Sequence, residues 1–186
     1  MEIMLTMLLS FATAVSPTVV NADFEQKDAR TGLPTGWAFT SLPDRQHLVN
    51  YRTTQVAAEQ GQTRALSITV ASDHPEHKVA YNIHQDLKGL TPGKSYRVSA
   101  RVCTRGLKTL PMIVVQCIDA SGSRFLGFAR SQQRELPGDL DHWEQIQTDI
   151  VIPEGTSTVR LRIGIPSAGN AGGTAIIDDV DMVEMN

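Results

Sequence analysis

Acidic and amide side chains cluster near both ends of this 186-residue chain. One group lies in Asn21-Ala-Asp-Phe-Glu25 and the other in Ile176-Ile-Asp-Asp-Val180. Both stretches are typical of strands that carry or end in carboxylates. Calcium takes six to eight oxygen ligands, mainly carboxylates and backbone carbonyls, so one ion can tie the first and last strands together. The two motifs leave a second interpretation open, in which each is a solvated acidic turn.

The chain between these motifs predicts an all-β domain. Apolar and polar residues alternate with a period of two, and turn sequences such as Thr91-Pro-Gly93 and Pro153-Glu-Gly155 separate the alternating segments, a pattern typical of a sandwich or barrel. No segment predicts a helix. The predicted strands cover residues 18–25, 37–42, 65–70, 79–87, 95–104, 112–119, 143–152, 157–165 and 175–184.

Alternation also predicts which side chains face the core. Tyr96, Val98 and Val102 point one way along their strand, and Arg97 and Arg101 point the other way. The strand at 112–119 is apolar on both faces except at one glutamine, which predicts a central position in a sheet.

Composition limits the classes of partner. The net charge of −3 and the absence of clustered Lys and Arg argue against a nucleic-acid surface. The length suits one domain, which we place at residues 17–186, as a monomer.

The N-terminal segment is typical of a secretory leader. Residues 3–15 are uncharged and mostly apolar, too short for the roughly 20 residues that span a bilayer, and Ala12-Thr-Ala14 fits a cleavage site. Glu2 stands where a leader carries a basic residue. We predict a signal peptide at residues 1–16 and a secreted, periplasmic or cell-surface protein whose mature chain does not insert into a membrane.

The two cysteines are predicted to be free thiols. Cys103 and Cys117 are expected on neighbouring antiparallel strands joined by a turn at 106–110. In that register they lie several residues apart along the ladder, farther than the roughly 7 Å between Cα atoms that a disulfide tolerates.

Five motifs in order along the chain resemble carbohydrate-binding modules of the family 4/9/22 type. The motifs are Asn21-Ala-Asp-Phe-Glu25, Leu33-Pro-Thr-Gly-Trp37, Gln85-Asp-Leu-Lys-Gly-Leu-Thr-Pro-Gly-Lys-Ser-Tyr-Arg-Val-Ser99, Trp143 and Ile177-Asp-Asp-Val180. The resemblance runs from about residue 19 to residue 184 and implies a two-sheet antiparallel β-sandwich, the galactose-binding-like jelly roll. It also implies a structural calcium held by the Asp23 carbonyl, the Glu25 carboxylate and Asp178, or a metal-free domain in which Asp178 accepts backbone hydrogen bonds.

The resemblance further implies a polysaccharide bound on the concave sheet. Aromatic rings stack on the C–H face of a sugar, while amides and guanidinium groups reach its hydroxyls. The predicted ligand-binding residues, taken from matching positions and from the polar stripe, are Tyr81, Gln85, Arg97, Arg101, Gln116, Phe125 and Arg162. Tyr51 and Phe128 are further aromatic candidates, and an arginine-rich cleft favours an acidic glycan. For Arg97 and Arg101 a solvated outer face is the alternative.

Other motifs are interpreted as structural. Trp37, Trp143 and Tyr96 are expected in the core. His74-Pro-Glu-His77 is expected to be a surface turn, and His84 a solvated side chain. No catalytic motif is present, so we expect a non-catalytic module. Two alternatives stay open: a structural or adhesion module of the same fold, and a small glycosidase or lyase built on a jelly roll.

Overall fold

The computed structural model describes residues 19–40, 42–58, 61–75 and 79–185. Within these ranges the chain forms ten strands and one short 3-10 helix, η1 (Pro43–Leu48). The strands are β1 (Ala38–Phe39), β2 (Val49–Ala58), β3 (Gly61–Val70), β4 (Ala80–Leu87), β5 (Ser95–Arg105), β6 (Met112–Ile118), β7 (Phe125–Arg130), β8 (Leu140–Val151), β9 (Thr158–Pro166) and β10 (Thr174–Met185).

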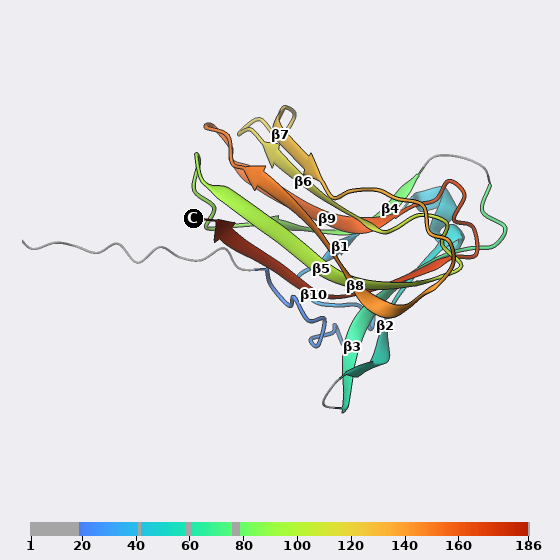
Figure 1. Cartoon of the computed structure of the whole chain (residues 1–186). Helices are drawn as coiled ribbons and strands as arrows, with labels where there is room; N and C mark the ends of the chain where they lie inside the picture. Colours follow the sequence, from blue (N-terminus) through green and yellow to red (C-terminus); the bar gives the residue numbers. More distant parts are fainter. Residues whose placement is uncertain (1–18, 41, 59–60, 76–78, 186) are drawn as a thin grey trace, which may run out of the picture.

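The strands form two five-stranded antiparallel sheets. The first sheet has the order β1-β4-β9-β6-β7 and the second β2-β3-β10-β5-β8. Figure 1 shows them as two stacked layers, with the hairpin of β2 and β3 projecting beyond the other strands. The predicted all-β sandwich is therefore confirmed.

The core lies between the two sheets and follows the alternation of the strands. In β5 the burial of successive residues alternates, so Tyr96, Val98 and Val102 are buried while Arg101 is exposed. The inner face of the first sheet contributes Tyr81, Ile83, Leu87, Ile113, Val115, Cys117, Val159, Leu161, Ile163 and Ile165, all at most 7% exposed. Apolar burial of this kind is the main stabilising term in folding.

The structure differs from the predicted strands in three places. Residues 19–25 do not form a strand, because Asn21 and Phe24 adopt positive φ angles of 51° and 53° and the backbone turns there. β2 and β7 were missed. Both are edge strands whose side chains are largely exposed or half-buried, so neither has the clean apolar alternation of an inner strand.

Both cysteines are free thiols, as predicted, although the predicted reason is wrong. Cys103 lies on β5 in the second sheet and Cys117 on β6 in the first sheet, so the two strands are not neighbours. Cys117 is buried and Cys103 is half-buried.

One buried glutamine fastens the N-terminal segment to the sandwich. The Gln85 carboxamide on β4 accepts a hydrogen bond from Val20 N (2.8 Å) and donates to the carbonyl oxygens of Val20 (3.0 Å) and Gly36 (2.8 Å). Trp37 Nε1 donates to the carbonyl of Asn21 (3.1 Å), and its ring packs against Phe24. The segment that lacks a strand ladder is thus held by side chains.

No helix in the described part of the chain combines the length and apolar character that crossing a membrane requires. The predicted leader at residues 1–16 lies outside the described residues.

Replacing Gln85 tests this fastening. Gln85→Leu keeps the side-chain volume but leaves three backbone groups without their partner, so we expect the free energy of unfolding to fall by about 3 kcal/mol. Urea unfolding measures the change, with the exposed Gln147→Leu as the matched control. Equal unfolding midpoints for the two variants would show that the carboxamide does not anchor this segment.

Candidate functional site

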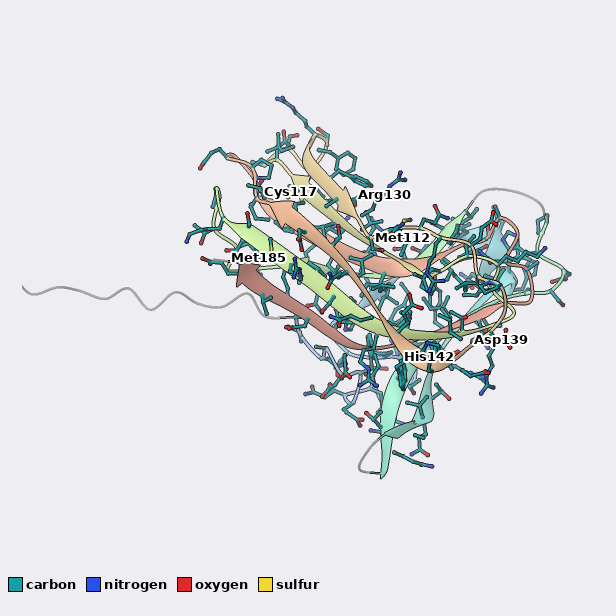
Figure 2. The ribbon with its side chains drawn as sticks, in the orientation of Figure 1. Met112, Cys117, Arg130, Asp139, His142 and Met185 are labelled. Carbon is teal, nitrogen blue, oxygen red and sulfur yellow. The ribbon has the colours of Figure 1, made fainter. Side chains whose placement is uncertain are left out.

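The outer face of the first sheet carries a row of polar side chains. Asn82 on β4, Arg162 on β9 and Gln116 on β6 all alternate with buried residues and therefore point away from the core. Phe128 on β7 is the register partner of Gln116 and extends the row to the edge of the sheet. We call Asn82, Arg162, Gln116 and Phe128 the polar row. Arg130, labelled in Figure 2, lies two residues farther along β7.

Hydrogen bonds hold the Arg162 guanidinium in the plane of this row. Its Nε donates to Gln116 Oε1 (2.9 Å), and Nη1 donates to Asn82 Oδ1 (3.0 Å). Both acceptors are neutral amides, and no carboxylate of a described residue forms an ion pair with this cation. Partial burial, followed by the neighbouring Arg160 charge, lowers the pKa of Arg162 from its ordinary value, yet the group remains cationic. The guanidinium is thus pre-positioned, with remaining donors available to a ligand.

His84 places an unsatisfied nitrogen beside Arg162, its register partner. Its Nδ1 is buried and has no hydrogen-bond partner among the described residues. Burial, together with the nearby Arg162 and Arg160 charges, lowers the pKa of His84 below its ordinary 6.5. The ring is therefore neutral at pH 7, and because its Nδ1 is enclosed by the protein, that nitrogen is not offered to a ligand. The alternation of β4 predicts that His84 lies on the polar face as a solvated side chain; it does lie on the outer face, but it is half-buried there.

The carboxylate on this face is already paired. Asp86 accepts a bidentate pair of hydrogen bonds from Arg160, at 2.6 and 2.8 Å. The hydrogen bonds from Arg160 hold the pKa of Asp86 below its ordinary value. A general acid needs a raised pKa, so Asp86 is not suited to that role.

The apolar part of the face lies on β7. Phe128 is 58% exposed and Phe125 is 60% exposed, which is unusual for side chains of this size. Phe128 lies beside Gln116, so a ring platform adjoins the hydrogen-bonding groups. This pairing of a flat apolar surface with amides and a guanidinium suits a sugar.

Five of the predicted ligand-binding residues lie on the first sheet. Three of them have side chains on its outer surface, and two have side chains buried in the core. Gln116, Arg162 and Phe125 are the three on the outer surface. Tyr81 and Gln85 are also on β4 but face the core, with 0% and 7% exposure, so their predicted contact with a ligand is wrong. Gln85 instead fastens residues 20 and 36.

Arg97 and Arg101 do not share a face with Arg162. Both lie on β5 in the second sheet, so the predicted arginine-lined cleft is wrong. Arg97 forms a bidentate ion pair with Asp149 (2.7 and 2.8 Å), and Arg101 pairs with Asp179 (2.7 Å). These ion pairs match the alternative interpretation, a solvated outer face.

Two further predictions about burial are wrong. Trp143 is half-buried on β8, with the Arg101 guanidinium 5.1 Å from its ring centroid, whereas Trp37 is buried as expected. His74 is 7% exposed and bonds through Nε2 to the Tyr81 hydroxyl (2.9 Å), so it belongs to the core rather than to a surface turn. His77 of the same motif lies outside the described residues.

The predicted calcium ligands do not fit a shared ion as they lie. Both oxygens of Glu25 are engaged: Oε1 accepts hydrogen bonds from the Thr63 hydroxyl (2.9 Å) and Arg64 N (2.7 Å), and Oε2 pairs with the Arg64 guanidinium (3.1 Å). Hydrogen bonds from Arg64 and Thr63 lower the pKa of Glu25. Among the described residues no three His, Cys, Asp or Glu side chains gather as a metal site. Calcium binding itself stays untested, and the ion pair of Glu25 leads us to expect that the domain folds without it.

Asp178 is the buried acidic group of the C-terminal motif. It is 3% exposed, and its Oδ1 accepts a hydrogen bond from Asp179 N (2.9 Å). Burial, with smaller contributions from the Asp179 and Asp23 charges, raises the pKa of Asp178 to about 7. The nearness of Asp23 agrees with the expectation that the two motifs meet, and the backbone contact Val180 N to Ala22 O (3.0 Å) joins them directly.

Comparisons with known proteins identify the fold. No protein-family model matches the chain, and no curated protein sequence is similar to it. Among solved structures, the second xylan-binding domain (CBM22-2) of Xyn10C from Paenibacillus barcinonensis is 16% identical with a TM-score of 0.60, over 88% of this chain and 98% of that one. The chain has the two-sheet β-sandwich fold of these carbohydrate-binding modules. Identities at this level establish the fold alone.

Two further similar structures show that this fold also occurs with other functions. The Stig cyclase Fisc from Fischerella sp. TAU is 14% identical with a TM-score of 0.62, over 93% of this chain and 98% of that one. The enzymatically active domain of bacteriophage CBA120 tailspike protein 4 is 14% identical with a TM-score of 0.62 over 90% of this chain. This chain spans only 21% of that tailspike domain. Function must therefore be argued from the site.

The Glu25 ion pair leads to a prediction about metal removal. Since Arg64 supplies the positive charge beside Glu25, we expect the melting temperature to be the same in EDTA and in excess calcium. Arg64→Met should instead lower stability by about 1 kcal/mol, the scale of a half-exposed ion pair. A melting temperature that rises with calcium and falls with EDTA would contradict this and restore the structural calcium.

The raised pKa of Asp178 predicts a pH dependence. The folded state keeps the Asp178 proton up to about pH 7, whereas the unfolded chain releases it near 3.8. Stability should therefore fall as the pH rises from about 4 to about 7 and then level off. Thermal melts should show no such decrease in stability for Asp178→Asn. The control variant Asp181→Asn, which changes an exposed residue, should show the same decrease as wild type. Parallel curves for wild type and Asp178→Asn would contradict the buried neutral carboxyl.

Proposed function

We propose that this chain is a non-catalytic carbohydrate-binding module that holds a polysaccharide on the outer face of the first sheet. The observation that carries the proposal is the polar row, in which a guanidinium held by two amides adjoins an exposed phenyl ring. Groups fixed before binding lose little side-chain entropy on contact with a ligand.

The dimensions of the row suit a sugar chain. It crosses four neighbouring strands, β4, β9, β6 and β7, and spans on the order of 15 Å at a strand spacing of about 4.8 Å. Phe128 can stack against one ring at the edge. Arg162 and Gln116 can bond to hydroxyls nearer the centre.

Charge on this face allows neutral or acidic polymers. Arg160 and Asp86 neutralise each other, which leaves Arg162 and the exposed Arg130 without an ion pair to a described residue. The similar solved structures include domains described as xylan-binding, so xylan is the first polymer to test.

Non-catalytic binding is supported by the carboxylates of this face. A glycosidase needs a pair of carboxyl groups about 5–10 Å apart, one of them with a raised pKa. Among the described residues of β4, β6, β7 and β9 the carboxylate is Asp86, and it is paired with Arg160. Secretion through residues 1–16 is part of the same proposal, since polysaccharides of this kind are met outside the cell.

Phe128→Ala tests the proposed site. Loss of the ring platform should weaken retention on soluble xylan at least about fivefold, as expected for an aromatic anchor at a binding site. Affinity electrophoresis against xylan and a panel of other polysaccharides measures the effect. Val151→Ala, which truncates a 57% exposed side chain on the second sheet, is the matched control and should be retained as wild type.

The outcomes separate the alternatives. Equal retention of Phe128→Ala and wild type would remove the polar row as the site. No retention of wild type on any polymer would favour a structural or adhesion module. Release of reducing sugar by wild type, lost in Asp86→Asn, would favour the enzyme.

A further inference from the structure

The outer face of the second sheet contains a hollow that the proposed function does not use. Its volume is about 600 Å³, within the range of small-molecule sites, and it lies between the edge strands β2 and β8. Strand β2, part of the hairpin that projects beyond the other strands in Figure 1, contributes Arg52 and residues 54–57 to the lining. His142, labelled in Figure 2, precedes Trp143 on the strand that forms the opposite wall.

One row of register partners runs across the floor of the hollow. Arg52, Ser67, Ile176 and Cys103 are successive register partners across β2, β3, β10 and β5. Ser67 is 1% exposed although it points to the outer face, so it lies at the bottom. The ladder between β5 and β8 shifts register at Cys103, as bulges near binding sites often do.

One wall presents an indole ring. Trp143 is half-buried and lines the hollow, and the Arg101 guanidinium, anchored to Asp179, lies 5.1 Å from its ring centroid. This cation–π contact holds the indole in one orientation. A fixed aromatic ring at the side of a polar hollow is a platform for a flat apolar surface.

Two guanidinium groups in the hollow have no balancing partner. Arg52 on β2 and Arg105 on β5 both line it, and neither forms an ion pair with a described residue. Among the described residues of the lining, Asp141 is the carboxylate that stands beside the two arginines, so the charge of these residues together is positive. Burial raises the pKa of the Cys103 thiol, which therefore stays neutral and does not repel an anion.

We infer that this hollow is a second ligand site, which takes a carboxylate-bearing sugar. The indole of Trp143 stacks on the C–H face of one ring, while Arg105 and, toward the β2 edge, Arg52 pair with carboxylates along the sugar chain. A guanidinium suits a carboxylate because it can donate two parallel hydrogen bonds to it. Ser67 and Thr174 also belong to the lining. The site is independent of the polar row, which lies on the other sheet.

Tryptophan fluorescence tests this site directly. The chain has two tryptophans, of which Trp37 is buried and Trp143 lines the hollow. Trigalacturonate should change the emission in a saturable way, and Trp143→Phe should abolish that change. Neutral galactotriose should give no change, and inorganic phosphate at the same concentration should not compete.

Arginine variants are then compared by calorimetric titration with trigalacturonate. Arg52→Gln and Arg105→Gln should each weaken binding at least about fivefold. Arg97→Gln, on the same sheet but already paired with Asp149, is the control and should bind as wild type. Phe128→Ala should also bind as wild type, which separates this site from the polar row.

Four results would overturn the inference. Galactotriose binding as tightly as trigalacturonate would remove the role of the carboxylate. Competition by phosphate would reduce the site to a simple anion site. Wild-type affinity in both Arg52→Gln and Arg105→Gln, or loss of affinity only in Phe128→Ala, would exclude the hollow.

Discussion

The burial of one face of each strand against the opposite sheet governs the whole structure. A sandwich closes only if alternate side chains of every inner strand are apolar and meet in the middle. The residues between them are then free for other uses. Because of this constraint, Tyr81 is buried and cannot contact a ligand, whereas its neighbour on β4, Asn82, lies on the outer face.

The same constraint creates two chemically different outer surfaces. On the first sheet, Arg162 is held by neutral amides, and its ion-paired neighbours Arg160 and Asp86 cancel. On the second sheet, ion pairs at Arg97 and Arg101 occupy one half of β5, and the other half borders a positively charged hollow. One scaffold thus offers a flat polar row and a concave pocket on opposite sides.

Alternation made much of the fold predictable from the sequence, including the buried Tyr96 and the outward Gln116 and Arg162. It could not say in which sheet a strand lies, so Arg97 and Arg101 were grouped with Arg162. The resemblance assigned Gln85 to a binding cleft, whereas the alternation of buried and exposed residues along β4 places it on the core side. The alternation proved correct, because Gln85 is buried. Edge strands such as β7 bury too little to leave a clear pattern.

The N-terminal region shows where local pattern stops being informative. Its motif resembles a strand, yet positive φ angles at Asn21 and Phe24 turn the chain, and long-range contacts hold it. Glu25 takes Arg64 as its partner, from 39 residues away. Such pairings depend on tertiary placement, which spacing along the chain does not encode.

The central claim is that a polysaccharide lies along the polar row. Backbone amide chemical-shift mapping by NMR during titration with soluble xylan oligomers tests it most directly. The account predicts shifts concentrated in β4, β6, β7 and β9, strongest around Gln116, Phe128 and Arg162, with β5 and β8 unchanged. Shifts confined to the second sheet, or none at saturating oligomer, would contradict it.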